Sequence, residues 1–175
     1  MKQLLFFLSF VLFSQGLSAQ ACGAPGYYFG SQATLNNFVT TYGGGGCSQT
    51  DGDLYLNGGS INDLSGLSFI TEVTGYVYIR GTSLTDVIGL QNITSIGDFL
   101  RIESNTSLTS LNGLAGLTTI NGQLSLTSNA TLTDITALQN LTTVGNGISI
   151  RYNNTLVSLA GLQGLTNVTG SISLQ

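Results

Sequence analysis

Apolar residues recur with a period of 23 or 24 residues from position 52 to the end of the chain. The clearest feature of each unit is a pair of apolar residues separated by one residue. Alternate side chains of a strand point to the same face, so each pair predicts a short strand with one buried face. The pairs are Leu54/Leu56, Val77/Ile79, Leu100/Ile102, Leu124/Leu126, Ile148/Ile150 and Ile172/Leu174.

Further apolar positions follow each pair at short intervals, which are too close for long helices and too irregular for one sheet. In the first unit they are Ile61, Leu64, Leu67, Ile70 and Val73. One rung cannot bury its apolar face, whereas stacked rungs share a continuous core. Residues 52–175 are therefore predicted to form a mainly β solenoid of 23–24-residue leucine-rich repeats, with five full repeats and a truncated sixth. Its rise is about 4.8 Å per rung.

The last strand of this pattern stops at the end of the chain. Ile172 and Leu174 would then lie on an open rung with an unpaired edge. We therefore expect the chain to be a fragment of a longer gene product.

Two columns of non-apolar residues also follow the repeat. Asn105, Asn129 and Asn153 each come three residues after a predicted strand. Asparagine at a turn can hydrogen-bond backbone groups through its amide, so this column predicts an asparagine ladder along the solenoid. The second column contains only small residues, because a larger side chain would crowd a corner of the coil. Its members are Gly66, Gly89, Gly113, Ala137 and Gly161.

Residues 20–51 do not follow the repeat. Leu35, Phe38, Val39 and Tyr42 have helical spacing after a possible N-cap at Ser31, and the glycine run 43–46 follows them. Solenoids need a terminal cap over the open core and strand edge of the first rung. Residues 20–51 are therefore predicted to form a short helical N-terminal cap.

The N-terminus has the pattern of a secretory signal peptide. Lys2 precedes an apolar run over 4–13, and Ala19 and Ala21 form a small-residue cleavage motif. A transmembrane anchor would need about 20 apolar residues, which this segment lacks. We expect residues 1–19 to be a signal peptide, cleaved after Ala19 or Ala21, and the protein to be secreted or attached to the cell surface.

Cys22 and Cys47 are the two cysteines of the chain. An even cysteine number in an exported chain favours a disulfide. An alternative is that Cys22 is the lipidated first residue of a lipoprotein, although Ala19 stands where a lipobox usually has leucine. We predict a Cys22–Cys47 disulfide within the cap.

Composition excludes several classes of function. Charged residues are 7% of the chain, the net charge is −4, and histidine does not occur. A basic nucleic-acid-binding surface, a histidine-based catalytic triad and a histidine metal site are therefore excluded. Asp51 and Asp53 hint at a calcium loop, but Tyr55 occupies the next ligand position, which favours a turn. We predict that the protein is not an enzyme and has no cofactor or metal.

The repeat block "LTSLNGLAGLTTINGQLSLTSN" resembles receptor L-domain repeats. Such repeats occur in the ligand-binding lobes of the insulin and epidermal growth factor receptors, in fungal cell-wall glycoproteins and in secreted or surface bacterial proteins. The block "SQATLNNFVTTYGGGGC" and the repeat after it are most similar to the bacterial set. The resemblance covers residues 31–175. It implies a single-stranded right-handed β-solenoid with a binding or adhesion function.

The outward positions of the predicted strands contain the candidate ligand-binding residues. Aromatic side chains fall on the first three strands, and the three arginines lie on the same sheet. Exposed aromatic rings beside arginine are typical of binding hot spots, and sugar rings stack on tyrosine faces. Alternatively, the aromatic residues only stabilise the sheet by cross-strand pairing. The candidates are Tyr55, Tyr76, Tyr78, Phe99, Arg101, Arg80 and Glu103, which we call the sheet-face patch.

The sequence favours a non-catalytic binding or adhesion module for an extracellular protein or glycan, with no nucleic acid and no membrane span. One alternative is an ice- or mineral-binding solenoid, and another is the non-catalytic part of a larger secreted enzyme. The ice-binding alternative rests on a threonine column, Thr71, Thr94, Thr118, Thr142 and Thr166. Asn-x-Ser/Thr sequons occur at Asn92, Asn105, Asn129, Asn140, Asn153 and Asn167.

Overall fold

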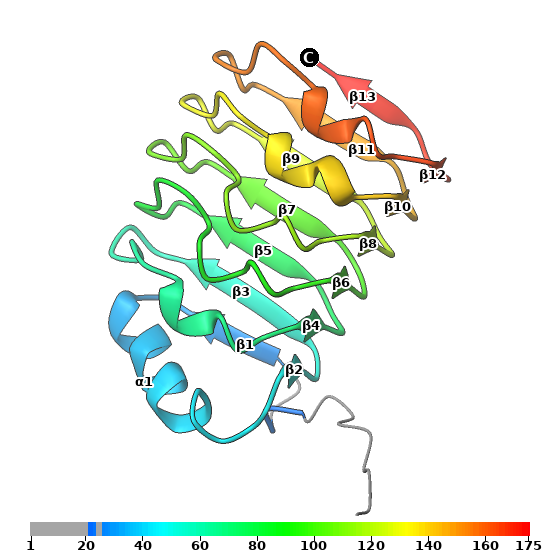
Figure 1. Ribbon diagram of the computed structural model, residues 1–175. Helices are drawn as coiled ribbons and strands as arrows, with labels where there is room; N and C mark the ends of the chain where they lie inside the picture. Colours follow the sequence, from blue (N-terminus) through cyan, green and yellow to red (C-terminus); the bar gives the residue numbers. More distant parts are fainter. Residues whose placement is uncertain (1–20, 24–25) are drawn as a thin grey trace, which may run out of the picture.

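The computed structural model describes residues 21–23 and 26–175, which form a stack of coils with a helix at one end (Figure 1). The predicted signal peptide, residues 1–19, lies outside the described residues. Within the described residues, the strands form two parallel sheets that alternate along the chain, so the mainly β solenoid is confirmed. The right-handed sense of the coil remains a prediction.

The larger sheet has seven strands, one from each coil. In spatial order they are β1 (Gly26–Phe29), β3 (Asp53–Asn57), β5 (Val77–Arg80), β7 (Leu100–Glu103), β9 (Leu124–Thr127), β11 (Ile148–Arg151) and β13 (Ile172–Leu174). Each strand pairs with the next one in the register of the repeat, so that Leu54 lies beside Val77 and Leu56 beside Ile79. Residues at equivalent repeat positions therefore form straight rows across this sheet.

The smaller sheet consists of six two-residue strands. They are β2 (Gln49–Thr50), β4 (Glu72–Val73), β6 (Ser95–Ile96), β8 (Thr119–Ile120), β10 (Thr143–Val144) and β12 (Asn167–Val168). Short 3-10 helices replace the extended chain at one corner of three coils, at η1 (Ser65–Leu67), η2 (Thr136–Asn140) and η3 (Ala160–Leu162). The sequence analysis did not predict these helices, because one turn of 3-10 helix leaves no periodic signal.

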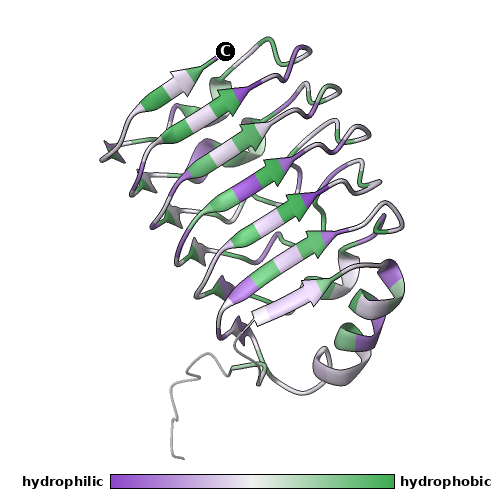
Figure 2. Cartoon of the chain, turned by 180° about the vertical axis from the view of Figure 1, so that it is seen from behind, coloured by the Kyte–Doolittle hydropathy of each residue, from purple (hydrophilic) through white to green (hydrophobic). Residues whose placement is uncertain are grey.

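The apolar columns line the interior between the two sheets. Leu54, Leu56, Ile102 and Leu126 are fully buried, while the strand positions between them face outward. Figure 2 shows this alternation as green segments separated by pale or purple ones. Burying one such side chain contributes about 1.5–3 kcal/mol, so the repeated columns are the main source of stability.

The N-terminal cap contains the predicted helix, α1 (Gln32–Tyr42). Ser31 is its N-cap and forms a capping box with Thr34. Leu35 and Phe38 are buried against the first coil, where the ring of Phe38 lies 5.8 Å from that of Phe69. The helix therefore closes one end of the apolar core.

Strand β1 also belongs to the cap, and the sequence analysis did not predict it. Tyr27 and Phe29 lie beside Leu54 and Leu56 of β3, so they face the core, whereas Tyr28 faces outward. The edge of β3 is thus covered by a cap strand. The four residues Gly26–Phe29 belong to no repeat, so periodicity alone did not reveal them.

The disulfide between Cys22 and Cys47 is present and confirms the predicted pairing. Both cysteines are buried, and the backbone N–H of Cys22 donates to the carbonyl of Gln49. A disulfide indicates an extracellular or otherwise oxidising location. A lipid on the Cys22 sulfur would be incompatible with this bond.

The asparagine column forms a chain of hydrogen bonds inside the solenoid. The backbone N–H of Asn105 donates to Oδ1 of Asn129, and that of Asn129 donates to Oδ1 of Asn153. The side-chain amide of Asn129 in turn donates to the carbonyl of Ile102. All three asparagines are buried, so the sequons at these positions have no accessible amide. The sequons at Asn92, Asn140 and Asn167 are exposed.

Candidate functional site

The outer face of the seven-stranded sheet contains every residue of the sheet-face patch. The register aligns the middle positions of four successive strands into one row, in which Tyr28 precedes Tyr55, Tyr78 and Arg101. Tyr28 is 62% exposed. The sequence analysis missed it because it lies on β1, although the alternation in Gly26–Phe29 was an available signal.

The aromatic rings of this row are in direct contact. The rings of Tyr55 and Tyr78 are stacked, with centroids 4.8 Å apart and planes 8° apart. Tyr28 meets Tyr55 edge-on at 5.0 Å, and the guanidinium of Arg101 lies 5.5 Å from the centre of the Tyr78 ring. Arg101 therefore ends the row through a cation–π contact.

A second aromatic pair lies in the neighbouring row. The rings of Tyr76 and Phe99 are stacked, with centroids 4.5 Å apart and planes 7° apart. In both rows the rings face one another along the solenoid. The flat faces of Tyr55 and Tyr78 are thus covered by neighbouring side chains. A sugar ring therefore has no free face of these two tyrosines on which to stack. The rings present their edges and hydroxyl groups instead.

Polar contacts join Tyr78, Arg101 and Glu103 within the patch. The hydroxyl of Tyr78 donates a 2.6 Å hydrogen bond to Oε2 of Glu103, and Nε of Arg101 lies 3.8 Å from the same oxygen. Burial raises the pKa of Tyr78 above its usual value, and the hydrogen bond and negative charge of Glu103 raise it further. The pKa of Tyr76 is also raised, first by burial and then by Asp53.

Arg80 lies on the same face but outside this network. It is exposed and aligned between Asn57 and Glu103, and it has no hydrogen bond or ion pair within the part of the chain that the structure describes. The structure thus brings six of the seven predicted residues into contact with another member of the patch, and Arg80 stands beside them.

A depression follows the aromatic rows, where the same repeat positions carry short side chains. Tyr55, Tyr78 and Arg101 are followed in register by Ser125, Ser149 and Ser173. The depression has a volume of about 360 Å³, and a smaller hollow of about 200 Å³ adjoins it beside Phe99. We call this region the serine trough, and its lining includes Phe99, Arg101, Gln123, Ser125, Ser149, Arg151, Tyr152 and Ser173.

The sequence analysis missed the serine trough, although it had placed these residues on the outer face. The available signal was the change from large to small residues within one row. Ser125, expected to point outward, is only 4% exposed, and its hydroxyl lies 3.3 Å from that of Thr127.

Charge is unevenly distributed over the molecule. The chain has three arginines, Arg80, Arg101 and Arg151, and all of them lie on strands of the seven-stranded sheet. Two carboxylates, Asp53 and Glu103, share that sheet. The strands of this sheet therefore carry three arginines and two carboxylates, a formal charge of 3 − 2 = +1, whereas the whole chain has a net charge of −4.

The threonine column forms a corner ladder. The hydroxyl of Thr118 donates to the carbonyl of Thr94, and that of Thr142 donates to the carbonyl of Thr118. Thr71, Thr94 and Thr166 make the same bond to the preceding coil. An ice-binding face needs hydroxyl groups free to meet solvent, so this arrangement counts against that alternative.

The carboxylate of Asp53 accepts the backbone N–H of Tyr76 at 3.1 Å, which is a structural role in the turn before β5. In residues 21–23 and 26–175, no three histidine, cysteine or acidic side chains gather as a metal site would require. The same described residues contain no helix long and apolar enough to cross a membrane.

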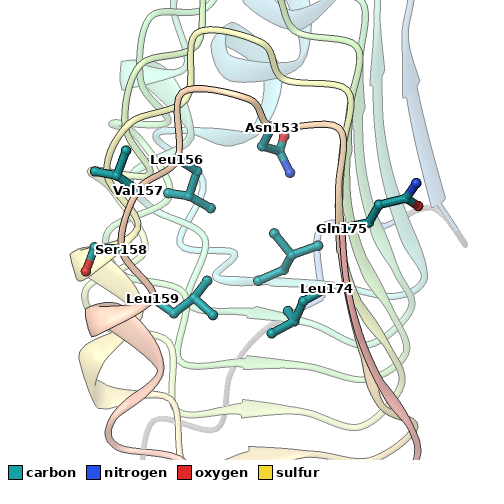
Figure 3. Close-up of a pocket in the computed structure, with 8 residues that line it drawn as sticks. Asn153, Leu156, Val157, Ser158, Leu159, Leu174 and Gln175 are labelled. Atoms are coloured by element: carbon teal, nitrogen blue, oxygen red, sulfur yellow. The ribbon is translucent and has the colours of Figure 1, made fainter.

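Another hollow, of about 210 Å³, lies at the C-terminal end of the stack (Figure 3). Leu156, Leu159 and Leu174 point into it, whereas Val157 and Ser158 point away. The three leucines belong to the apolar columns that form the core of the preceding coils. This hollow is therefore the uncovered interior of the last coil.

The stacked coils, the apolar columns and the asparagine ladder define a leucine-rich β-solenoid. Residues 46–109 match the family model described as Receptor L domain, which confirms over this segment the resemblance seen in the repeat motifs. No curated protein matches the chain, and no solved structure matches it.

Proposed function

We propose that this protein is a secreted or cell-surface, non-catalytic binding or adhesion module that presents its seven-stranded sheet to an extracellular protein or glycan. The observation that carries the proposal is the connected cluster around Tyr78, Arg101 and Glu103 on that sheet. Receptor L domains are typically non-catalytic, which agrees with this proposal. Extended faces of solenoids commonly act as binding surfaces.

A purely structural role of the aromatic rows is the main competing explanation. Cross-strand pairs stabilise a sheet by about 0.2–1 kcal/mol each, and the stacked rings have this geometry. Stability alone does not explain why the row continues to Tyr28, which is largely exposed, or why it ends in an exposed arginine. Tyrosine and arginine together are enriched in the residues that dominate binding energy.

The proposal is tested by probing an array of purified glycans and extracellular protein domains with the secreted chain. The double substitution Tyr78→Ala with Arg101→Ala should weaken binding to a positive probe at least about tenfold, because it removes one hot-spot pair. The matched control is Gln139→Ala with Gln163→Ala, since both glutamines are exposed and lie away from this sheet. Circular dichroism should show an unchanged fold for both variants. Equal affinity of the Tyr78/Arg101 variant and the wild type would refute the assignment of the surface.

A further inference from the structure

The serine trough differs from the patch beside it in the chemistry it offers. Its floor consists of hydroxyl and amide groups from Gln123, Ser125, Ser149 and Ser173. Gln123 and Ser149 make no side-chain hydrogen bond within the described residues, so their polar groups are available to a ligand. Protein hot spots are usually aromatic or aliphatic anchors in desolvated pockets, and this floor offers little apolar surface to such an anchor.

Two guanidinium groups border the trough. Arg101 stands at the aromatic end, where its Nε approaches Glu103 and its two terminal nitrogens have no hydrogen-bond partner among the described residues. Arg151 lies two coils further along the solenoid, or about 10 Å in the stacking direction. Nε and Nη2 of Arg151 both donate to the hydroxyl of Ser173, which holds this side chain against the floor. Arginine pairs with carboxylate and sulfate-like oxyanions through paired N–H groups.

One aromatic ring, that of Phe99, lines the smaller hollow of the trough. Tyr76 covers one side of the Phe99 ring, and the smaller hollow lies between Phe99 and the next coil, with Gln123 and Ser125 in its lining. The C–H groups on the face of a pyranose ring can pack against the apolar ring of Phe99. The hydroxyl groups around the rim of the sugar can then hydrogen-bond the neighbouring polar side chains. This is the kind of surface that the tyrosine rows, with their faces occupied, do not provide.

Tyr152 adds a second aromatic group to the lining, in an unusual backbone conformation. Its φ is 57°, in the left-handed region, whereas the equivalent positions of earlier coils carry Gly81, Ser104 and Ser128. The Cβ of a residue other than glycine is crowded in this conformation, so tyrosine is less stable there than glycine. The side chain is nevertheless 53% exposed and gains little burial in return. A strained residue at the edge of a depression is consistent with a role in binding.

We propose that the serine trough binds an acidic polysaccharide. In this assignment, Arg101 and Arg151 pair with the carboxylate or sulfate groups, Gln123 and Ser149 hydrogen-bond the sugar hydroxyls, and a sugar ring packs against Phe99 in the smaller hollow. The assignment rests on the proposed binding function of this sheet and specifies the chemistry of the ligand. The concentration of all three arginines on one face of an otherwise acidic molecule supplies the charge complementarity.

The test measures binding of the secreted chain to polygalacturonate, to dextran sulfate and to neutral dextran. We expect binding to at least one of the two acidic polymers, with affinity that falls as salt rises, and no comparable binding to dextran. Binding of polygalacturonate would identify carboxylate as the recognised group, and binding of dextran sulfate would identify sulfate. Equal binding of dextran, or no binding of either acidic polymer, would overturn the proposal.

Two variants outside the sheet-face patch test the position of the site. Ser149→Tyr fills the floor without changing charge, and the fold accepts tyrosine at this position because Tyr55 and Tyr78 occupy it in earlier coils. Arg151→Gln removes one guanidinium group. Arg151→Gln should weaken binding of the acidic polymer at least about tenfold, the usual effect of losing one charge-assisted contact. Ser149→Tyr should weaken it by about the same factor, because the larger side chain occupies the space that the sugar would fill.

The matched charge control is Gln139→Glu, because it lowers the net charge by one, as Arg151→Gln does, at an exposed position away from this sheet. It should weaken binding less than about threefold, the small effect of an isolated surface charge. An equal loss in Gln139→Glu and Arg151→Gln would show attraction by general charge and would overturn the trough assignment. If instead the Tyr78/Arg101 double variant loses a partner on the array while no acidic polymer binds, the proposed function stands and the trough assignment fails.

Discussion

The hydroxyl of Tyr78 donates a 2.6 Å hydrogen bond to the carboxylate of Glu103 on the next coil. The guanidinium of Arg101 lies over the same tyrosine ring and close to the same carboxylate. A phenol, a carboxylate and a guanidinium are thus held together across two strands. Because each group restrains the others, the centre of the sheet-face patch is ordered before any partner binds.

The first prediction concerns the titration of Tyr78. Its pKa should lie above 10.0, because burial and Glu103 both favour the neutral phenol in the folded protein. The folded state then keeps a proton that the unfolded state loses, so the stability contributed by this group is present below pH 10 and decreases as pH rises through the folded pKa. An NMR titration of the tyrosine ring carbons, assigned by comparison with Tyr78→Phe, measures the value.

The substitution Glu103→Gln is the partner experiment for this titration. It removes the negative charge while keeping a hydrogen-bond acceptor, so the pKa of Tyr78 should move down towards its usual value. An unchanged Tyr78 pKa in Glu103→Gln would show that burial alone causes the shift.

The second prediction concerns the asparagine ladder. In Asn129→Ala, the backbone N–H of Asn105 loses its acceptor and the carbonyl of Ile102 loses its donor, both in the buried interior. Each unsatisfied buried group costs about 1–3 kcal/mol, so for two groups we expect a loss of about 2–6 kcal/mol in the free energy of unfolding. Urea denaturation measures this loss. Asn154→Ala is the control, because Asn154 is exposed and makes no side-chain hydrogen bond in the described residues, and it should change stability by less than about 0.5 kcal/mol.

The third prediction separates backbone strain from steric crowding at a glycine. Gly81 has φ of 56°, yet an added Cβ there would meet only Oδ1 of Asn57, at 3.9 Å. Gly81→Ala should therefore destabilise the protein by about 1 kcal/mol through conformation alone. Gly44→Ala is the control, since an added Cβ there meets nothing within 4 Å and Gly44 is not among the positive-φ glycines. It should be neutral or stabilising, by up to about 1 kcal/mol. A loss in Gly44→Ala as large as in Gly81→Ala would refute this explanation.

The fourth prediction concerns the disulfide of the cap. Cys22 and Cys47 are 25 residues apart, and closing a loop of this size stabilises a protein by about 3 kcal/mol in the chain-entropy model. Reduction should therefore lower the free energy of unfolding by about that amount. Peptide mapping of the unreduced secreted chain should recover the Cys22–Cys47 pair. A lipid adduct on Cys22 would contradict both expectations.

The repeat made most of the fold predictable. In a solenoid each coil contacts only its neighbours, so a position in one repeat meets the same position in the next, and sequence period becomes spatial register. This is why the contact between Tyr55 and Tyr78 and the chain from Asn105 to Asn129 were both predictable from spacing. The cap helix was predictable for another reason, since Leu35 and Phe38 follow helical spacing behind a capping residue.

The sequence by itself determined the period, the strand face on which each repeat residue lies and the rows that those residues form. The tertiary structure decided what periodicity does not encode. It placed the non-repeat strand Gly26–Phe29 beside β3, which added Tyr28 to the aromatic row. It also turned the tyrosine rings against one another and opened the serine trough where large side chains give way to small ones. Ring orientation and surface relief depend on the side chains of several coils at once, whereas a repeat pattern specifies one position at a time.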